Sequence, residues 1–176
     1  TMTPDMALLY IQSADGWVEE FIDLNQSELF NEENYDYLLR EAKTSAMLSD
    51  WIGEVKEELI SDRYRIGPGD IRRSAETAEW LMHSLAELSK HLELGITFRA
   101  EQLSVRLHYG AGQDLLSLLD LKGVGRVRAR KLHQSGITNR EKLKSTGPAE
   151  VARLLGPKIA EKVLIQLARE ERMDGM

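Results

Sequence analysis

The segment that most restricts the fold is a short turn in the last third of the chain, Leu121-Lys122-Gly123-Val124-Gly125. It follows an apolar stretch, Leu115 to Leu119, and precedes a basic stretch with Ala129 and Leu132 at helical spacing. Two glycines around one aliphatic residue permit the positive φ angles of a tight turn, while Val124 can anchor that turn in a core. The pattern predicts two short helices joined by a tight turn.

Such a turn directs backbone N–H groups outward at the start of a helix, where they attract a phosphate without reading any base. The candidate contacts are Gly123, Val124 and Gly125 of the turn and Arg126, Arg128, Arg130 and Lys131 of the following helix. Counterion release makes binding by these cations sensitive to salt. Non-specific DNA binding is therefore predicted, and a compact connector that docks a protein is the alternative.

The same tail contains a faint internal repeat with an offset of 31 residues. Residues 125–132 align with residues 156–163, and Gly, Ala, Lys and an aliphatic residue recur in register. A pair of stacked helix-hairpin-helix motifs leaves such a repeat, because each unit alone is too small to bury its apolar face. Leu154 stands where the first unit has Gly123, so the second unit is degenerate.

Charge is divided unevenly along the 176 residues. Residues 1–112 hold 10 Lys and Arg against 21 Asp and Glu, whereas residues 113–176 hold 13 against 8. The net charges of −11 and +5 meet at Tyr109-Gly110-Ala111-Gly112, where helical spacing also breaks. We expect a helical bundle over residues 1–112 and a small DNA-binding domain over residues 113–176. A basic tail that is only solvated is the alternative.

Helical spacing dominates the front of the chain as well, so the predicted class is all-α. The expected helices cover Gly16 to Leu24, about Glu33 to Leu59, Ile71 to about Leu92, and Arg99 to Leu107. Asp70 is expected to cap the third of these, and Gly95 to follow its end. The second has an apolar stripe of Leu38, Ala42, Ala46, Ile52, Val55 and Leu59. Trp51 and Met47 are expected in the same core, and Ala7 to Ile11 fits a strand or a helix start.

The helix after Asp70 has a clear apolar side, formed by Ile71, Ala75, Ala78, Met82, Leu85 and Leu92. Trp80 lies about 180° from Ile71, and Arg73 lies within about 20° of Trp80. An exposed Trp beside an Arg is typical of proteins that bind single-stranded nucleic acid, because bases stack on the indole while the guanidinium contacts a phosphate. A second helix packed on that face is the alternative interpretation.

Composition and motifs exclude several classes of protein. Without Cys, the chain has neither disulfides nor thiolate metal ligands. No apolar run approaches the roughly 20 residues of a membrane helix, so we expect a cytoplasmic, nucleoid-associated protein with no membrane partner. The four histidines lack metal-ligand spacing, and neither a phosphate loop nor an Asp-Glu-x-His motif is present. No catalytic residue, metal site or cofactor is therefore expected in this chain.

Three stretches together resemble the C-terminal part of the Ski-like superfamily 2 DNA helicases, in particular the archaeal fork helicases related to animal helicase Q. They are Thr3-Pro4-Asp5-Met6 with Leu9-Tyr10, Gly67 to Arg73 with Glu76 to Leu81, and Gly123 to Leu132. They span nearly the whole chain, in the order of the family. The resemblance implies a bundle with a ratchet helix, about residues 70–92, followed by a helix-hairpin-helix domain.

In that family the ratchet helix crosses the path of the translocating strand, which makes Arg73 and Trp80 the expected strand contacts. The hairpin domain is expected to hold the departing single strand, through Arg128 and Arg130, and to act as a brake on the motor. The implied partners are single-stranded or forked DNA, the motor domains of the parent protein, and replication or repair proteins. ATP and Mg²⁺ belong to those motor domains, so this chain, which begins with Thr1, is expected to be an inactive fragment of a 3′ to 5′ helicase.

One other function is compatible with these residues, and one class of enzyme that shares the hairpin fits them poorly. A free-standing module could use the hairpin and the Trp80 face to bind protein, or could bind DNA without specificity. Base-excision glycosylases also use the hairpin, but they place a catalytic Asp downstream of it, and Arg126 to Ala149 contains no Asp.

Overall fold

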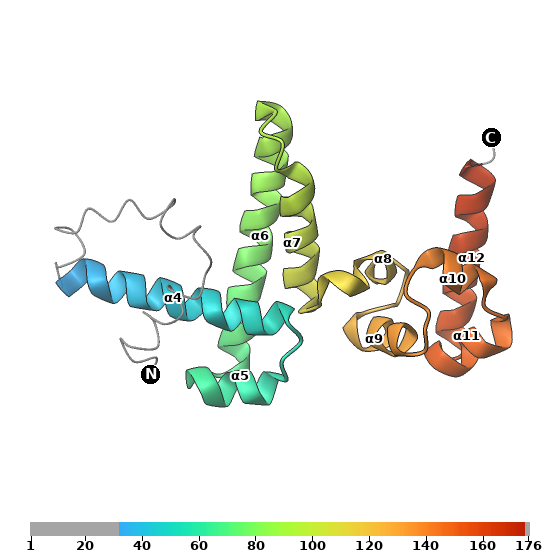
Figure 1. Ribbon diagram of the computed structural model, residues 1–176, viewed down its shortest axis with the longest axis horizontal. Coiled ribbons are helices and arrows are strands. Elements are labelled where there is room, and N and C mark those ends of the chain that lie inside the picture. Colours follow the sequence, from blue (N-terminus) through green and yellow to red (C-terminus); the bar gives the residue numbers. More distant parts are fainter. Residues whose placement is uncertain (1–31, 175–176) are drawn as a thin grey trace. The chain divides into compact units, whose positions relative to one another are not determined.

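The computed structural model describes residues 32–174, and every regular element in this range is helical (Figure 1). The all-α prediction is therefore confirmed for these residues, while the expectations for Ala7 to Ile11 and for Gly16 to Leu24 lie outside them. By contacts between Cα atoms the chain divides into two units, residues 1–78 and 79–176, and each is described by itself. The domain boundary expected at residue 112 stays a prediction.

The first unit contains α4 (Glu32–Ile52), α5 (Glu57–Tyr64) and the beginning of α6 (Pro68–Leu92). The buried side chains of its core come from all three helices: Ala46, Met47, Trp51, Ile60, Tyr64, Ile71 and Ala75. The expectation that Trp51 and Met47 lie in a core is confirmed. The Tyr64 hydroxyl donates to Asp50 Oδ2 at 2.9 Å, and burial together with this hydrogen bond raises the pKa of Tyr64 to about 12.

The expectation of one helix from about Glu33 to Leu59 is wrong. Helix α4 ends at Ile52, and Glu54 then takes a left-handed φ of +63°. The Val55 N–H donates back to Asp50 O at 3.0 Å, which satisfies one of the last carbonyls of α4 as the chain turns. Because Val55 keeps the apolar spacing across this turn, the hydrophobic pattern alone does not show the break.

Helix α6 begins earlier than expected. Pro68 is its first residue, and the Ile71 N–H donates to Gly67 O at 3.2 Å. Asp70 therefore lies inside the first turn, and its predicted role as the N-cap is wrong. Proline favours a helix start because its φ is already near the helical value and because it lacks an N–H that would be left unpaired there.

The predicted apolar side of α6 is largely covered, and its buried or half-buried members are Ile71, Ala75, Ala78, Met82 and Leu85. Leu92 is an exception, with 63% of its surface exposed, because α6 ends at this residue and Glu93 turns the chain with a φ of +53°. Leu59 of α5, which was predicted in the apolar stripe of the helix expected from about Glu33 to Leu59, is also exposed, at 54%, because Ile60 rather than Leu59 faces the core of the first unit. Both predictions are wrong at the level of the single residue.

The second unit contains the end of α6 and α7 (Thr97–Tyr109), which lie side by side (Figure 1). Ser104 Oγ donates to Glu79 O at 3.3 Å, and His108 Nδ1 lies 2.9 Å from Glu79 Oε1, so both residues of α7 contact the same residue of α6. Gly110 follows α7 with a left-handed φ of +59°. The predicted stop at this glycine is confirmed.

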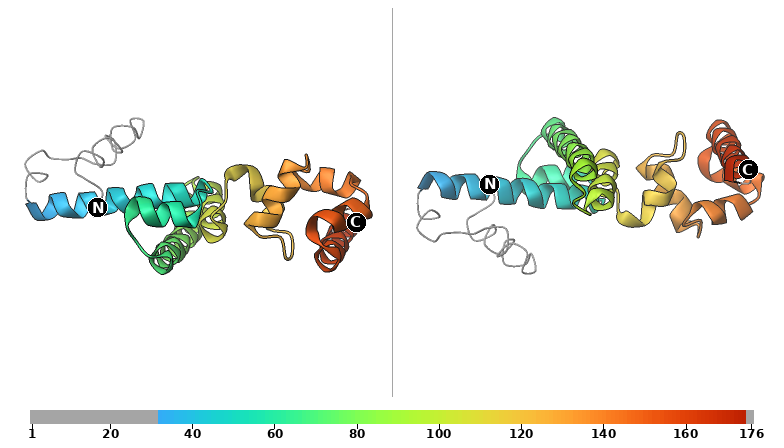
Figure 2. Two further views of the ribbon diagram at one scale, coloured as in Figure 1. Left: turned by 90° about the horizontal axis from the view of Figure 1, so that it is seen from below. Right: turned by 90° about the horizontal axis from the view of Figure 1, so that it is seen from above.

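Up to Asp174, the rest of the second unit is made of one 3-10 turn and five α-helices (Figure 1, Figure 2). They are η1 (Gln113–Leu115), α8 (Leu116–Leu119), α9 (Arg126–Gln134), α10 (Arg140–Ser145), α11 (Pro148–Leu155) and α12 (Pro157–Asp174). Buried side chains of these elements form one core. The fully buried side chains come from both halves of the repeat and include Leu118, Leu132, Val151 and Val163. Each hairpin thus completes the core of the other, as the repeat predicts.

The two hairpins differ at their turns. In the first, residues 120–125 separate α8 from α9, whereas in the second only Gly156, with a φ of +84°, separates α11 from α12. Leu154, which stands at the position of Gly123, is buried within α11. The second hairpin therefore has no loop that could present backbone donors, and the degeneracy seen in sequence is also structural.

Gly123 is restricted twice, because its φ is +82° and a Cβ there would lie 3.0 Å from Ile159 Cδ1. We expect Gly123→Ala to lower the free energy of local opening of the first hairpin by about 1–2 kcal/mol, since the alanine must accept a left-handed backbone and displace Ile159. Hydrogen exchange of peptides that span α8 and α9 measures this change.

Two other glycines separate the two effects. Gly136 has a φ of +84° but open space around its Cβ position, so Gly136→Ala should show the backbone cost alone. Gly147 has a φ of −60° and open space, so Gly147→Ala should show neither of these costs, only that of a poorer N-cap for α11. If Gly123→Ala exchanged no faster than Gly147→Ala, the structure of this turn would be wrong.

Candidate nucleic-acid interface

The first hairpin holds its turn through one buried residue. Val124 is 2% exposed, and its N–H donates to Leu121 O at 2.9 Å. The predicted role of Val124 as the anchor of the turn is confirmed. Of the two flanking glycines only Gly123 has a positive φ, whereas Gly125 is extended at −95° and serves as the N-cap of α9. The expectation of a positive φ at Gly125 is therefore wrong.

The start of α9 follows directly from this turn. Its first bond joins the Ala129 N–H to Gly125 O at 3.0 Å. The N–H groups that precede Ala129 point out of the helix start, and the helix dipole adds partial positive charge there. A phosphate is the ligand that such a start favours.

The back of the turn is bound to α12. The Lys122 N–H donates to Gln166 Oε1 at 2.8 Å, and Gln166 Nε2 donates to Glu170 Oε1 at 3.0 Å. Arg140 of α10 forms ion pairs with both Asp120, the first residue of the turn, and Glu170. Two carboxylates thus favour the charged form of the guanidinium, and the pKa of Arg140 rises, mainly through its hydrogen bond to Asp120. The second hairpin therefore braces the first.

The four predicted cations of α9 do not share one face. Arg126 donates from Nη1 to Gly110 O at 3.0 Å, and Arg128 donates from Nη1 to Gly123 O at 3.1 Å. Arg130 binds Asp114 with two guanidinium nitrogens, at 2.6 and 3.2 Å. Lys131 is exposed. Arg128 and Lys131 are therefore the cations of α9 best suited to bind a phosphate, whereas Arg130 is already bound to a carboxylate.

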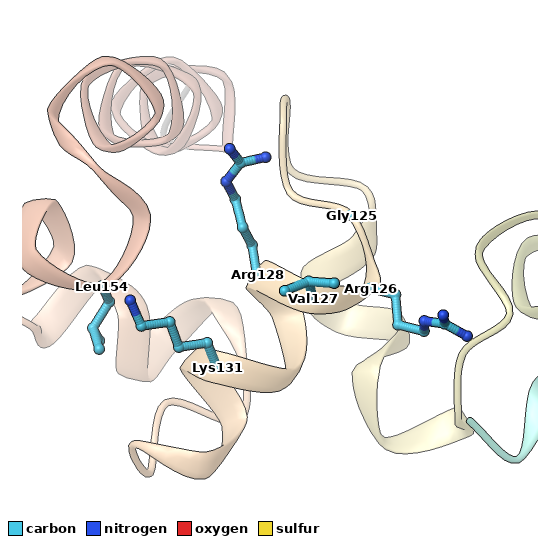
Figure 3. A pocket seen from close by; sticks show the side chains of 6 residues that line it. All are labelled: Gly125, Arg126, Val127, Arg128, Lys131 and Leu154. Carbon is cyan, nitrogen blue, oxygen red and sulfur yellow. The ribbon is translucent and has the colours of Figure 1, made fainter. Parts of the chain in front are cut away.

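A groove of about 520 Å³ lies beside the start of α9, and we call it the α9 groove. Its lining residues are Gly125, Arg126, Val127, Arg128, Lys131 and Leu154 (Figure 3). Figure 3 shows Lys131 directed toward Leu154 of α11, and Arg126 directed away from both. The groove thus combines cations of the first hairpin with an apolar residue of the second.

The residues predicted on α6 lie on one helix and are exposed. Trp80 has 64% of its surface exposed, and the side chain of Arg73 is 79% exposed with Nη1 3.5 Å from Asp70 Oδ1. The two positions are seven residues apart, so they lie on nearly the same side of α6.

None of the described helices is both long and apolar enough to cross a membrane.

Three residues of this region were not predicted from the sequence: Val127, Leu154 and Gln166. Leu154 was noted only as a break in the repeat, and its place in the α9 groove depends on how α11 packs against α9. Gln166 lies 44 residues after Lys122, a separation at which no local pattern indicates a hydrogen bond. Val127 gives no signal in the sequence, because single apolar residues are common on solvated surfaces.

Two helical hairpins in tandem define a helix-hairpin-helix protein. Residues 115–169 match the family described as "SAM-like Helix-hairpin-helix tandem", and residues 1–110 match "Archaeal helicase, domain 4". The chain belongs to the archaeal Hel308 family of DNA helicases and corresponds to their C-terminal domain 4 with the helix-hairpin-helix region. The helicase resemblance is thereby confirmed, while the relation to animal helicase Q stays a prediction.

Three similar proteins are described as "ATP-dependent DNA helicase Hel308". That of Methanocella arvoryzae is 39% identical over 96% of this chain and 24% of its own length. That of Methanocaldococcus jannaschii is 46% identical over 71% of this chain and 10% of its own length, and that of Pyrococcus horikoshii is 40% identical over 77% and 19%. The chain therefore spans a quarter or less of these relatives, and matches a region rather than a whole helicase.

The Arg130–Asp114 pair gives the hairpin a pH-dependent contribution to stability. The hydrogen bond from Arg130 lowers the pKa of Asp114, so the pair stabilises the fold above the unfolded pKa of an aspartate, about 4, and is lost as pH falls through the lower folded value. We expect Asp114→Asn to destabilise α9 at pH 7, by less than about 1 kcal/mol because the carboxylate is partly exposed. Denaturant unfolding from pH 7 to pH 2 measures the difference.

The difference in the free energy of unfolding between Asp114→Asn and the native chain should decrease below about pH 4. Glu150→Gln is the matched control, because Glu150 forms a similar pair with Arg153 on the surface of α11 and its pKa is also lowered. A destabilisation by Asp114→Asn that stayed constant down to pH 2 would show that the charge of Asp114 is not involved.

Proposed function

We propose that this chain is the non-catalytic DNA-binding end of an ATP-dependent 3′ to 5′ DNA helicase, where it guides and grips the translocated single strand during fork unwinding or repair. The first hairpin carries the proposal: the buried Val124 holds the turn so that α9 begins at the surface, beside Arg128 and Lys131. Backbone donors at a helix start and flexible cations both bind phosphates, and neither reads a base. Membership of the family, with relatives described as ATP-dependent DNA helicases, supports the same function.

We assign a second contact with the strand to α6. The exposed indole of Trp80 offers a flat surface on which a base can stack, and the guanidinium of Arg73 can reach the backbone on the same side of the helix. The exposure of Trp80 supports this role rather than packing within the described chain. As a helicase moves, Trp80 would stack on successive bases while Arg73 holds the backbone, so that each movement carries the strand in one direction.

ATP supplies the energy for such movement in the motor domains of a helicase. The residues of this chain do not fit ATP or Mg²⁺: the glycines before α9 are followed by Arg126 and Val127 instead of the Lys and Ser or Thr of a phosphate loop. Within residues 32–174, no group of three or more His, Asp or Glu side chains is placed to hold a metal ion. The role that we propose for this chain is to bind and orient the strand.

A protein contact on the α6–α7 hairpin would complement the DNA contacts. Large apolar side chains are exposed along the end of α6, the connection and α7: Leu81, Leu88, Leu92, Leu94, Ile96, Phe98 and Val105. An exposed apolar surface of this kind marks a protein interface more often than a solvated face. We propose that the motor domains of the parent helicase cover it, with replication or repair proteins as further partners.

The DNA contact of α9 should be visible in the salt dependence of binding. For a fluorescent oligothymidine, each phosphate contact contributes about 0.7 to the slope of the logarithm of the association constant against the logarithm of salt concentration. Arg128→Ala/Lys131→Ala should therefore weaken binding and lower the slope by about 1.4. Arg130→Ala should have a smaller effect, because Arg130 is paired with Asp114. Fluorescence anisotropy over a range of salt concentrations gives both quantities.

The matched control removes two exposed cations elsewhere in the second unit, with Lys142→Ala/Arg169→Ala. It should keep the native slope, because neither residue lines the α9 groove. Undetectable binding of the native chain at low salt, or equal slopes for both double variants, would refute the proposed DNA contact of α9.

The contact on α6 is best tested in a full-length helicase that carries this region. Trp80→Ala should reduce unwinding of forked DNA at least tenfold while the melting temperature stays within about 1 °C, because the side chain is mostly exposed and few packing contacts are lost. Trp80→Phe, which keeps an aromatic face, should recover part of the activity. Tyr37→Ala removes an exposed aromatic residue of α4 and is the control.

Normal unwinding by Trp80→Ala would eliminate the proposed role of this residue. A melting temperature several degrees lower would indicate instead that Trp80 packs against another part of the helicase, and that its exposure is a property of this chain alone.

A further inference from the structure

The first turn of α9 contains an apolar side chain that the fold does not require. Val127 is 78% exposed, more than any other large apolar residue among those the structure describes. A β-branched residue also costs some helix propensity, so local stability does not explain its presence. A single exposed valine needs no function on its own. Its surroundings in the α9 groove are therefore decisive.

The second hairpin contributes one apolar side chain to the same groove. Leu154, which stands where the first hairpin has Gly123, lines the α9 groove together with Val127. A glycine at that position would permit a second turn with exposed backbone donors, but here α11 continues through Leu154. The second repeat thus lacks a phosphate-binding turn and adds an apolar surface beside the cations of the first.

We propose that the α9 groove binds an unstacked nucleobase of a single DNA strand, and that it thereby distinguishes single-stranded from duplex DNA. This inference rests on the proposed DNA-binding function and adds a ligand to the same site. A nucleotide combines an apolar base with a charged phosphate, and the groove combines Val127 and Leu154 with Arg128 and Lys131. The positive charge of the groove is complementary to the negative charge of the phosphates of the strand.

A duplex cannot use the apolar part of this groove. Its bases are stacked and paired, so a protein that follows its backbone meets phosphates and sugars only. A single strand can rotate a base out of its stack at small cost and place it against an apolar side chain. The volume of about 520 Å³ lies in the range of pockets that hold small organic ligands, which is sufficient for one base.

Val127→Thr tests the proposal, because threonine keeps the β-branched shape and replaces one methyl group with a hydroxyl. The affinity of the full chain is measured for three fluorescent probes. They are an oligothymidine, an oligonucleotide of the same length with abasic sites, and a duplex of the same length. Val127→Thr should weaken binding of the oligothymidine by about three- to tenfold. It should leave the affinity for the abasic strand and for the duplex unchanged, since both present phosphates without an available base.

Ile165→Thr, at a partly exposed β-branched residue of α12 outside the groove, is the matched control and should change none of the three affinities. Trp80 is the same in all these chains, so base stacking on α6 cancels in the comparison. If Val127→Thr weakens the binding of all three probes equally, or of none, the base site does not exist, although the proposed DNA binding stands. If the native chain binds no probe at low salt, the proposed function itself fails, and the base site fails with it.

Discussion

The position of the α9 helix start depends on the contact between the two hairpins. Gly123 takes a left-handed φ and lies against Ile159, while Val124 is inserted into a core built from both repeats. A turn of this kind has no internal hydrogen-bond ladder and would not be stable in isolation. The hydrogen bond from the Lys122 N–H to Gln166 holds the same turn from behind. The second repeat therefore determines where the donors and cations of the first are placed.

Positive charge in the tail is only partly available to a ligand. The net charge of +5 over residues 113–176 indicates a nucleic-acid contact, but Arg130 is bound to Asp114 and Arg140 to Asp120 and Glu170. These pairs join separate helices, and thus contribute to the geometry of the hairpin rather than to its affinity for phosphate. A count of cations overestimates the number of phosphate contacts for this reason.

Much of the fold could be predicted from local patterns, and the exceptions have physical causes. The stop at Gly110, the anchor at Val124 and the buried positions of Trp51 and Ile71 follow from turn chemistry and helical spacing, both of which act over a few residues. The break after Ile52 could not be predicted, because the apolar spacing continues across it. The partners of Arg130 and Lys122 could not be predicted either, since they depend on tertiary packing between residues 16 and 44 positions apart in the sequence.

The asymmetry of the tandem suits a strand that must move. Two gripping turns would each add phosphate contacts, and the affinity for DNA would rise with every contact. In this chain only the first hairpin presents a loop, and the second continues through Leu154 to a single linking glycine. Under the proposed function, one gripping turn limits the energy needed to release each phosphate. Under the further proposal of a base site, Val127 and Leu154 of the α9 groove then add an apolar contact that a strand can form and break one base at a time.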